Sequence, residues 1–79
     1  MTGIRKIRVF MEETIKVHVT LIPTSRFPNG KFYNGFFIEE KEGYFIFRDD
    51  VEGDVRIFLE DIDNVEEYKK EFKSSFFQP

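Results

Sequence analysis

Residue types that usually carry catalysis or bind metals are sparse in this chain. His18 is the only histidine and there is no cysteine, so neither a thiolate nor a second imidazole is available to complete a metal site or activate a nucleophile. The sequence also lacks a glycine-rich phosphate cradle and a serine nucleophile elbow. We therefore interpret His18 as a surface or packing residue, and predict a protein that is not an enzyme and uses no cofactor and no metal.

Four carboxylates, Asp49, Asp50, Glu52 and Asp54, are concentrated around one predicted turn. Closely spaced carboxylates are typical of calcium loops, but the twelve-residue pattern that ends in a bidentate glutamate is absent. We interpret this acidic group as a solvated turn.

Charge divides the chain into two unequal parts. The net charge is −3, yet residues 1–26 carry +3 and the remaining residues carry −6. Nucleic-acid binding depends on a basic surface that displaces counterions from phosphates, which only the first third of the chain could supply. The same division would suit two copies that meet head to tail, positive part against negative part. Charge alone does not choose between these two uses.

The N-terminal segment, residues 1–13, fits two conformations. Ile4, Ile7 and Met11 recur at helical spacing, which predicts a short amphipathic helix. Ile7, Val9 and Met11 also alternate with polar or aromatic neighbours, which would make the segment an edge strand. Both conformations remain open at this point.

The segment 15–65 is predicted to form an antiparallel meander. Apolar residues alternate in its first strand, the pair Asn29-Gly30 is typical of a tight turn, and Gly35 inside the next strand indicates a sharp bend or a close backbone approach. No segment is long enough to be a crossover helix, which argues against a parallel sheet or a ferredoxin-like sandwich. Short strands with a glycine bend imply a small, strongly bent sheet closed into a barrel. The predicted strands cover residues 15–21, 31–40, 44–48 and 55–59.

Two structures are possible after the fourth strand. Residues 60–62 predict a single helical turn, followed either by a short strand or by a helix. The spacing of Val65, Tyr68 and Phe72 favours a C-terminal helix over residues 65–73, with a tail at 74–79. The whole chain, residues 1–79, is then one mainly β domain with a short helix at each end.

This order of elements resembles the Sm-like proteins, ring-forming small barrels associated with RNA metabolism. The stretch from Asn29-Gly30 to Gly35 is similar to the Asn-Gly-x4-Gly signature of that family, and Asp49 falls near the acidic end of its third strand. The likeness covers roughly residues 4–65. It implies a barrel of the Sm-like or SH3-like kind that assembles into a homo-oligomer through its edges.

The residues that line the uridine pocket of that family are not matched. Where the family places an Asp and then a Met-Asn pair that contacts a base, this chain has Lys41 followed by Tyr44 and Phe45. Where the family has an Arg-Gly pair, this chain has Glu60 and Asp61, which would repel phosphate. The resemblance therefore implies architecture and assembly rather than that pocket.

Aromatic residues are unusually abundant. Eleven phenylalanines and three tyrosines are more than one small barrel can easily enclose. Neighbouring residues of a strand point to opposite faces, so one member of a Phe-Phe pair on a strand should point away from the interior. Exposed aromatic side chains suggest an interface. The candidate interface residues are Phe36, Phe37, Phe58, Phe76 and Phe77.

Two functions are compatible with these observations. In the first, a self-assembling Sm-like module contacts RNA or another single-stranded nucleic acid through basic and aromatic side chains. In the second, the module binds another protein, or acts as a scaffold, with no nucleic-acid role. The apolar runs are too short to cross a bilayer, so we expect a cytoplasmic protein with no membrane partner. The candidate nucleic-acid residues are Arg5, Lys6, Arg8, Arg26, Phe27, Lys31, Tyr33 and Asn34.

Overall fold

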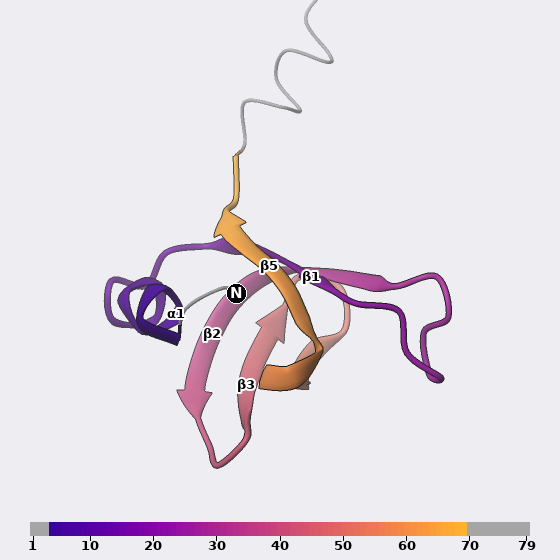
Figure 1. Cartoon of the computed structure of the whole chain (residues 1–79). Coiled ribbons are helices and arrows are strands. Elements are labelled where there is room, and N and C mark those ends of the chain that lie inside the picture. The colour runs from indigo at the N-terminus through magenta and orange to yellow at the C-terminus, as the bar shows by residue number, and fades with distance from the viewer. Residues whose placement is uncertain (1–3, 70–79) are drawn as a thin grey trace, which may run out of the picture.

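One antiparallel sheet forms most of the structure, a computed structural model that describes residues 4–69 (Figure 1). A single helix precedes the sheet, so the helical alternative for the N-terminal segment is confirmed and the edge-strand alternative is wrong. The elements are α1 (Ile4–Glu12), β1 (Val17–Leu21), β2 (Lys31–Glu40), β3 (Tyr44–Asp49), β4 (Gly53–Phe58), the 3-10 turn η1 (Leu59–Asp61) and β5 (Ile62–Glu67).

The strands follow the order β4-β3-β2-β1-β5, and all neighbouring pairs are antiparallel. After β4 the chain turns through η1, and β5 then lies beside β1, with Val65 opposite Val19. The outer edges of β4 and β5 have no strand partner within residues 4–69. The mainly β fold is therefore confirmed, whereas the sheet does not close and the predicted barrel is not established.

Gly35 lets β2 pass close to its neighbours in the middle of the sheet. It is paired with Val17 on one side and with Asp49 on the other. A Cβ at this position would lie 1.8 Å from the carbonyl oxygen of Arg48, a separation that no side chain can adopt. The interior glycine of the sequence thus marks a close backbone approach, as predicted.

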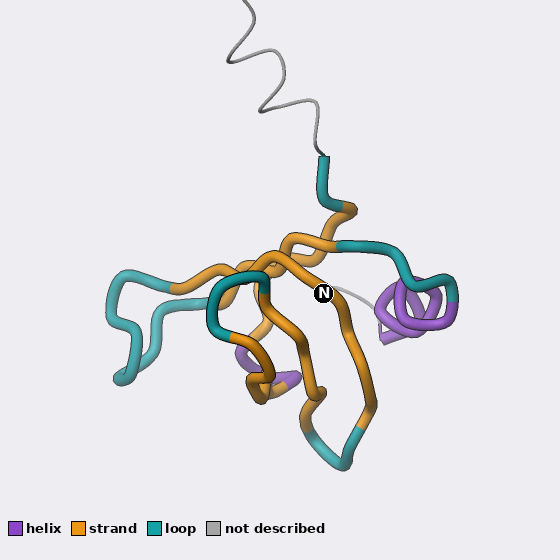
Figure 2. Tube along the Cα trace, turned by 180° about the vertical axis from the view of Figure 1, so that it is seen from behind, coloured by secondary structure: helices purple, strands orange, loops and turns teal. Residues whose placement is uncertain are grey.

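The core lies on one face of the bent sheet and is covered at one end by α1 (Figure 2). Alternation along β1 buries Val17, Val19 and Leu21 and leaves the residues between them half-buried. Phe37 packs edge-on against the rings of Phe45 and Phe47, with centroids 5.2 and 5.0 Å away. The fully or nearly buried apolar residues are Ile7, Val17, Val19, Leu21, Tyr33, Phe37, Phe45, Phe47, Ile57 and Val65.

The C-terminal helix predicted over residues 65–73 is wrong where the structure describes it. Residues 65–67 belong to β5, residues 68–69 are not helical, and residues 70–73 lie outside the described part. The helical spacing of Val65 and Tyr68 was overridden by pairing with the free edge of β1, which satisfies a row of backbone groups. A register shift between Thr20 and Leu21 hides the strand in the sequence, because it breaks the alternation of apolar residues.

Residues 4–69 contain no helix that is long and apolar enough to span a membrane.

Candidate functional site

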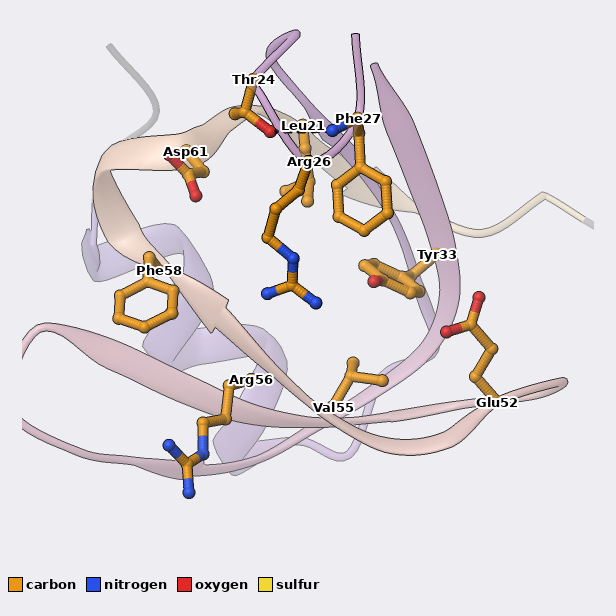
Figure 3. A pocket seen from close by; sticks show the side chains of 10 residues that line it. All are labelled: Leu21, Thr24, Arg26, Phe27, Tyr33, Glu52, Val55, Arg56, Phe58 and Asp61. Atoms are coloured by element: carbon orange, nitrogen blue, oxygen red, sulfur yellow. Dashed lines mark hydrogen bonds between the residues drawn. The ribbon is translucent and has the colours of Figure 1, made fainter. Parts of the chain in front are cut away.

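A pocket of about 420 Å³ lies between the loop at residues 22–30 and strand β4 (Figure 3). This volume falls in the range of pockets that hold small molecules or single bases. It is lined by Leu21, Thr24, Arg26, Phe27, Tyr33, Glu52, Val55, Arg56, Phe58 and Asp61.

The loop is held by its own short hydrogen bonds. Thr24 and Phe27 form a local turn in which the Thr24 N–H donates to the Phe27 carbonyl (3.0 Å) and the Phe27 N–H donates to the Thr24 hydroxyl (3.1 Å). The Gly30 N–H also donates to the Phe27 carbonyl at 2.9 Å. Gly30 has φ +83°, which glycine adopts without strain. These bonds position Arg26 and Phe27 at the mouth of the pocket.

Arg26 is directed into the middle of the pocket (Figure 3). Its guanidinium carbon lies 5.4 Å from the centroid of the Phe27 ring. Within residues 4–69 it has no carboxylate at ion-pairing distance. Arg56 also has no such carboxylate, but its guanidinium lies near the Tyr44 ring at 5.6 Å and points away from the pocket. Arg26 is therefore the cation that this site offers to a ligand.

Two carboxylates line the same space. Glu52 is paired with Lys31 at 2.6 Å, and this hydrogen bond raises the pKa of the Lys31 ammonium. Asp61 is held by its backbone, whose carbonyl accepts the Ile22 N–H at 2.9 Å, and its carboxylate is directed toward the pocket in Figure 3. No ion pair engages the Asp61 carboxylate within the described part of the chain. The pocket thus presents unpaired donors on Arg26 and unpaired acceptors on Asp61.

Aromatic rings form much of the remaining wall. Phe27 is half-buried, Phe58 is 41% exposed, and Tyr33 is only 6% exposed. Burial raises the pKa of the Tyr33 phenol, with the carboxylate of Glu52 adding to the effect, so the hydroxyl stays protonated at neutral pH. Flat apolar faces beside a guanidinium are the groups on which nucleobases stack.

The structure separates seven of the eight candidate nucleic-acid residues into two groups, and Asn34 belongs to neither. Arg26, Phe27 and Tyr33 line the pocket, and Lys31 is beside them, 5.5 Å from the centroid of the Phe27 ring. The helix α1, which carries the other basic candidates, lies at the opposite side of the sheet from the loop at residues 22–30 (Figures 1 and 2).

The basic residues of α1 differ in their availability. Arg5 and Lys6 are exposed. Arg8 donates two hydrogen bonds to the carboxylate of Glu40, at 3.0 and 2.9 Å, which raise the pKa of Arg8 and lower that of Glu40. A guanidinium satisfied in this way is poorly placed to bind a phosphate.

Asn34 faces the other side of β2. Its Oδ1 lies 2.6 Å from Nδ1 of His18, and its backbone N–H donates to the Asp49 carboxylate at 3.0 Å. Asn34 therefore does not belong to the pocket.

The candidate interface residues also differ in their surroundings. Phe37 is 5% exposed and belongs to the core, which corrects its prediction as an interface residue, whereas Phe36 is half-buried. Phe58 is exposed and its ring lies 5.6 Å from that of Tyr44. Phe76 and Phe77 lie outside the described residues.

Asp49 does not belong to a solvated turn, which corrects one member of the predicted acidic group. It is 8% exposed, and its carboxylate accepts hydrogen bonds from the N–H groups of Asn34 (3.0 Å), Val51 (2.9 Å) and Glu52 (2.8 Å). Burial raises the pKa of this carboxyl, but the three N–H donors, aided by Lys31, outweigh burial and lower it overall. Asp49 thus holds the β3–β4 turn, which carries Glu52 to the rim of the pocket.

No metal-binding cluster is present in the described part of the chain, where no group of three or more His, Cys, Asp or Glu side chains could hold an ion.

Sequence reasoning missed Glu52, Arg56 and Asp61 as pocket residues. No spacing rule connects them with Arg26, because the loop meets η1 through a long-range backbone hydrogen bond between Ile22 and Asp61. Sequence reasoning also missed Phe32 as an exposed aromatic residue. Its side chain is 59% exposed, and its ring centroid lies 5.3 Å from that of His18. The pairing of Phe32 with Thr20, on the polar face of β1, could have indicated this exposure.

No protein-family model, curated protein or solved structure significantly matches this chain. Its function is therefore inferred from its own residues and geometry.

Proposed function

We propose that this chain is a non-enzymatic binding module of the Sm-like kind, which self-associates and contacts single-stranded RNA at the pocket between the loop at residues 22–30 and β4. The observation that carries the proposal is Arg26, an unpaired guanidinium in a pocket with aromatic walls.

Single-stranded RNA is bound through its unstacked bases, which pack on aromatic rings and guanidinium planes while cationic groups attract the backbone. Phe27 and Phe58 supply ring surface, and Arg26 supplies the cation. Stacking contributes about 1–3 kcal/mol per base in proteins of this type. One pocket therefore supports weak binding, and tight binding requires several copies of the pocket on one assembly.

The surroundings of the pocket favour base contact over phosphate contact. The segment after residue 26 carries a net charge of −6, and Glu52 and Asp61 line the pocket itself. Carboxylates repel phosphate groups, so phosphates are expected to stay at the rim. Binding should accordingly be weak and only modestly reduced by salt, because few phosphates are neutralised.

Self-association is supported by the two free sheet edges. β4 and β5 are the two edge strands of the sheet within residues 4–69, and edge strands pair readily with other strands. Phe58, the last residue of β4, and Leu59, the first residue of η1, are 41% and 39% exposed. The N-terminal helix, the Asn29-Gly30 turn and the glycine-bent β2 are among the features on which the resemblance to Sm-like proteins is based.

Fluorescence anisotropy with a labelled single-stranded RNA tests RNA binding. We expect binding at about 50 mM salt that weakens only a few-fold at about 200 mM salt, because about one phosphate is neutralised. Arg26→Ala should weaken RNA binding about tenfold or more. The matched control is Arg5→Ala, which alters an exposed side chain at the far side of the sheet and should have a smaller effect. Absence of binding at the lower salt concentration would eliminate the RNA function.

The alternative is a protein-interaction or scaffold module with no nucleic-acid role, favoured by the Tyr44–Phe58 ring pair beside the free edge of β4. Light scattering tests the assembly that both alternatives share. We expect a mass well above that of the 9.5 kDa chain and a reduced mass for Phe58→Glu. Assembly without RNA binding would favour the alternative, and a monomer at tens of micromolar would refute self-association.

A further inference from the structure

We infer that the pocket selects guanine among the RNA bases. This inference rests on the proposed RNA contact and adds a base preference to it. It depends on two side chains that enter the pocket from separate segments, Arg26 from the loop at residues 22–30 and Asp61 from η1 (Figure 3).

The Asp61 carboxylate requires a ligand with hydrogen-bond donors. An ionised carboxylate only accepts hydrogen bonds, through two adjacent oxygens. The Watson–Crick edge of guanine offers two adjacent donors, the N1–H and the exocyclic N2 amino group. Adenine and cytosine each offer one amino group beside a ring acceptor, and uracil offers one N–H between two carbonyls. Guanine is therefore the base that satisfies both carboxylate oxygens.

The Arg26 guanidinium requires the opposite chemistry. It has five N–H donors and no acceptor, and its fork matches the O6 and N7 acceptors of guanine in the most common base-specific contact of arginine. Guanine is thus the one base that presents paired donors on one edge and paired acceptors on another. Both edges are needed to satisfy Asp61 and Arg26 together.

Arg26 and Asp61 are not paired with each other, so both remain available to a ligand. Arg26 and Asp61 line one pocket, yet they are not within the 4 Å at which they would pair with each other. Direct pairing would have neutralised both groups and removed the recognition site. The pocket volume of about 420 Å³ admits a purine, and Phe27 and Phe58 provide faces for stacking.

Five-nucleotide RNAs of sequence UUXUU, with X as guanine, adenine, cytosine or uracil, test the inference by anisotropy at about 50 mM salt. We expect the guanine RNA to bind about tenfold tighter than the other three. Replacing guanine by hypoxanthine, which lacks only the N2 amino group, should remove most of this preference.

Two variants assign the preference to Asp61. Asp61→Asn replaces one acceptor oxygen by a donor, so it should bring the guanine and hypoxanthine RNAs to similar affinities. Glu60→Gln is the matched control, since Glu60 is the exposed neighbour in η1 and does not line the pocket, and it should keep the preference. The hypoxanthine comparison uses the unmodified protein and does not depend on whether either variant folds.

The outcomes separate this inference from the proposed function. Similar affinities for all four RNAs would overturn guanine selection and leave RNA binding intact. A preference that hypoxanthine retains would also overturn it, because the N2 amino group would then not be read. Absence of binding to every RNA would overturn both.

Discussion

Removal of the Asp49 carboxylate should destabilise the fold more than removal of any exposed carboxylate. Asp49→Ala leaves three N–H groups without their acceptor, those of Asn34, Val51 and Glu52. Val51 and Glu52 are exposed turn residues whose N–H groups water can reach, whereas the Asn34 N–H lies within the sheet. A hydrogen bond to a charged group contributes about 1.5–3 kcal/mol, and a rehydrated one less. We therefore expect a loss of about 3 kcal/mol, a large fraction of the free energy of unfolding of a small domain.

The size of this loss should depend on pH. The pKa of the Asp49 carboxyl in the folded chain is lowered from its ordinary value of 3.8. The unfolded chain therefore takes up a proton at this residue at a higher pH than the folded chain does. The stabilisation is then fully present above the unfolded pKa and disappears as the pH falls through the folded pKa. The difference in stability between the natural protein and Asp49→Ala should be constant near neutrality and should shrink in acid below about pH 4.

Urea unfolding followed by circular dichroism measures this difference at one fixed chain concentration, because self-association would make stability concentration-dependent. Asp54→Ala is the matched control, since it removes a carboxylate from the same hairpin that forms only an exposed ion pair with Arg48 and should have little effect. The reasoning would be refuted if Asp49→Ala were as stable as Asp54→Ala at neutral pH. It would be refuted equally if the difference persisted unchanged in strong acid.

Two further substitutions and one titration test the fold. Gly35→Ala should prevent folding, because its Cβ would lie 1.8 Å from the Arg48 carbonyl oxygen. The control Gly43→Ala, in open space at φ +86°, should remain folded. Comparable circular dichroism spectra for the two variants would contradict this prediction. Ile7→Ala should cost about 2–5 kcal/mol in urea unfolding, since Ile7 is the fully buried residue of α1; a loss below about 1 kcal/mol would show that the helix does not cover the core. The pKa of the buried Tyr33 phenol, measured by ultraviolet absorbance, should lie above the ordinary value of 10.0. The folded chain then keeps a proton that the unfolded chain loses, so the free energy of unfolding should fall as the pH rises past about 10. Titration of every tyrosine at its ordinary pKa would refute this.

Local signals in the sequence were sufficient to predict the strands and turns at the centre of the sheet. Asn29-Gly30 before β2 and Gly43 before β3 place the turns, and the predicted range 31–40 is the observed extent of β2. Gly35 was informative because glycine weakens the interior of a strand and occurs there mainly where the chain bends or another backbone comes close. Turn chemistry and backbone sterics act over a few residues, which is why the sequence reports them directly.

Long-range pairing was not visible in the same way. The spacing of Val65 and Tyr68 favoured a helix over the short-strand alternative, but residues 62–67 form a strand because β1 offers an edge about 45 residues earlier in the chain. Whether the sheet closes is likewise decided by strand curvature and not by local pattern, so the predicted barrel could not be derived from turns alone.

The pocket contains residues that local sequence signals identify and residues that only long-range contacts bring there. Arg26 and Phe27 were identified because basic and aromatic residues in a loop suggest binding. Asp61 was interpreted only as a departure from a family pattern, because the hydrogen bond from Ile22 that brings it to the loop has no signature in the sequence. Tyr33 and Phe37 were grouped with surface residues by type, although alternation along β2 buries both.

The most direct test of the RNA contact is a titration of the ¹⁵N-labelled protein with a guanine-containing single-stranded RNA, followed by amide chemical shifts. We predict that the largest shifts fall on Arg26, Phe27 and Asp61, two segments that meet only in the folded pocket. Shifts confined to Arg5 and Lys6 on α1, or no shifts at all, would contradict the assignment of the binding site to this pocket.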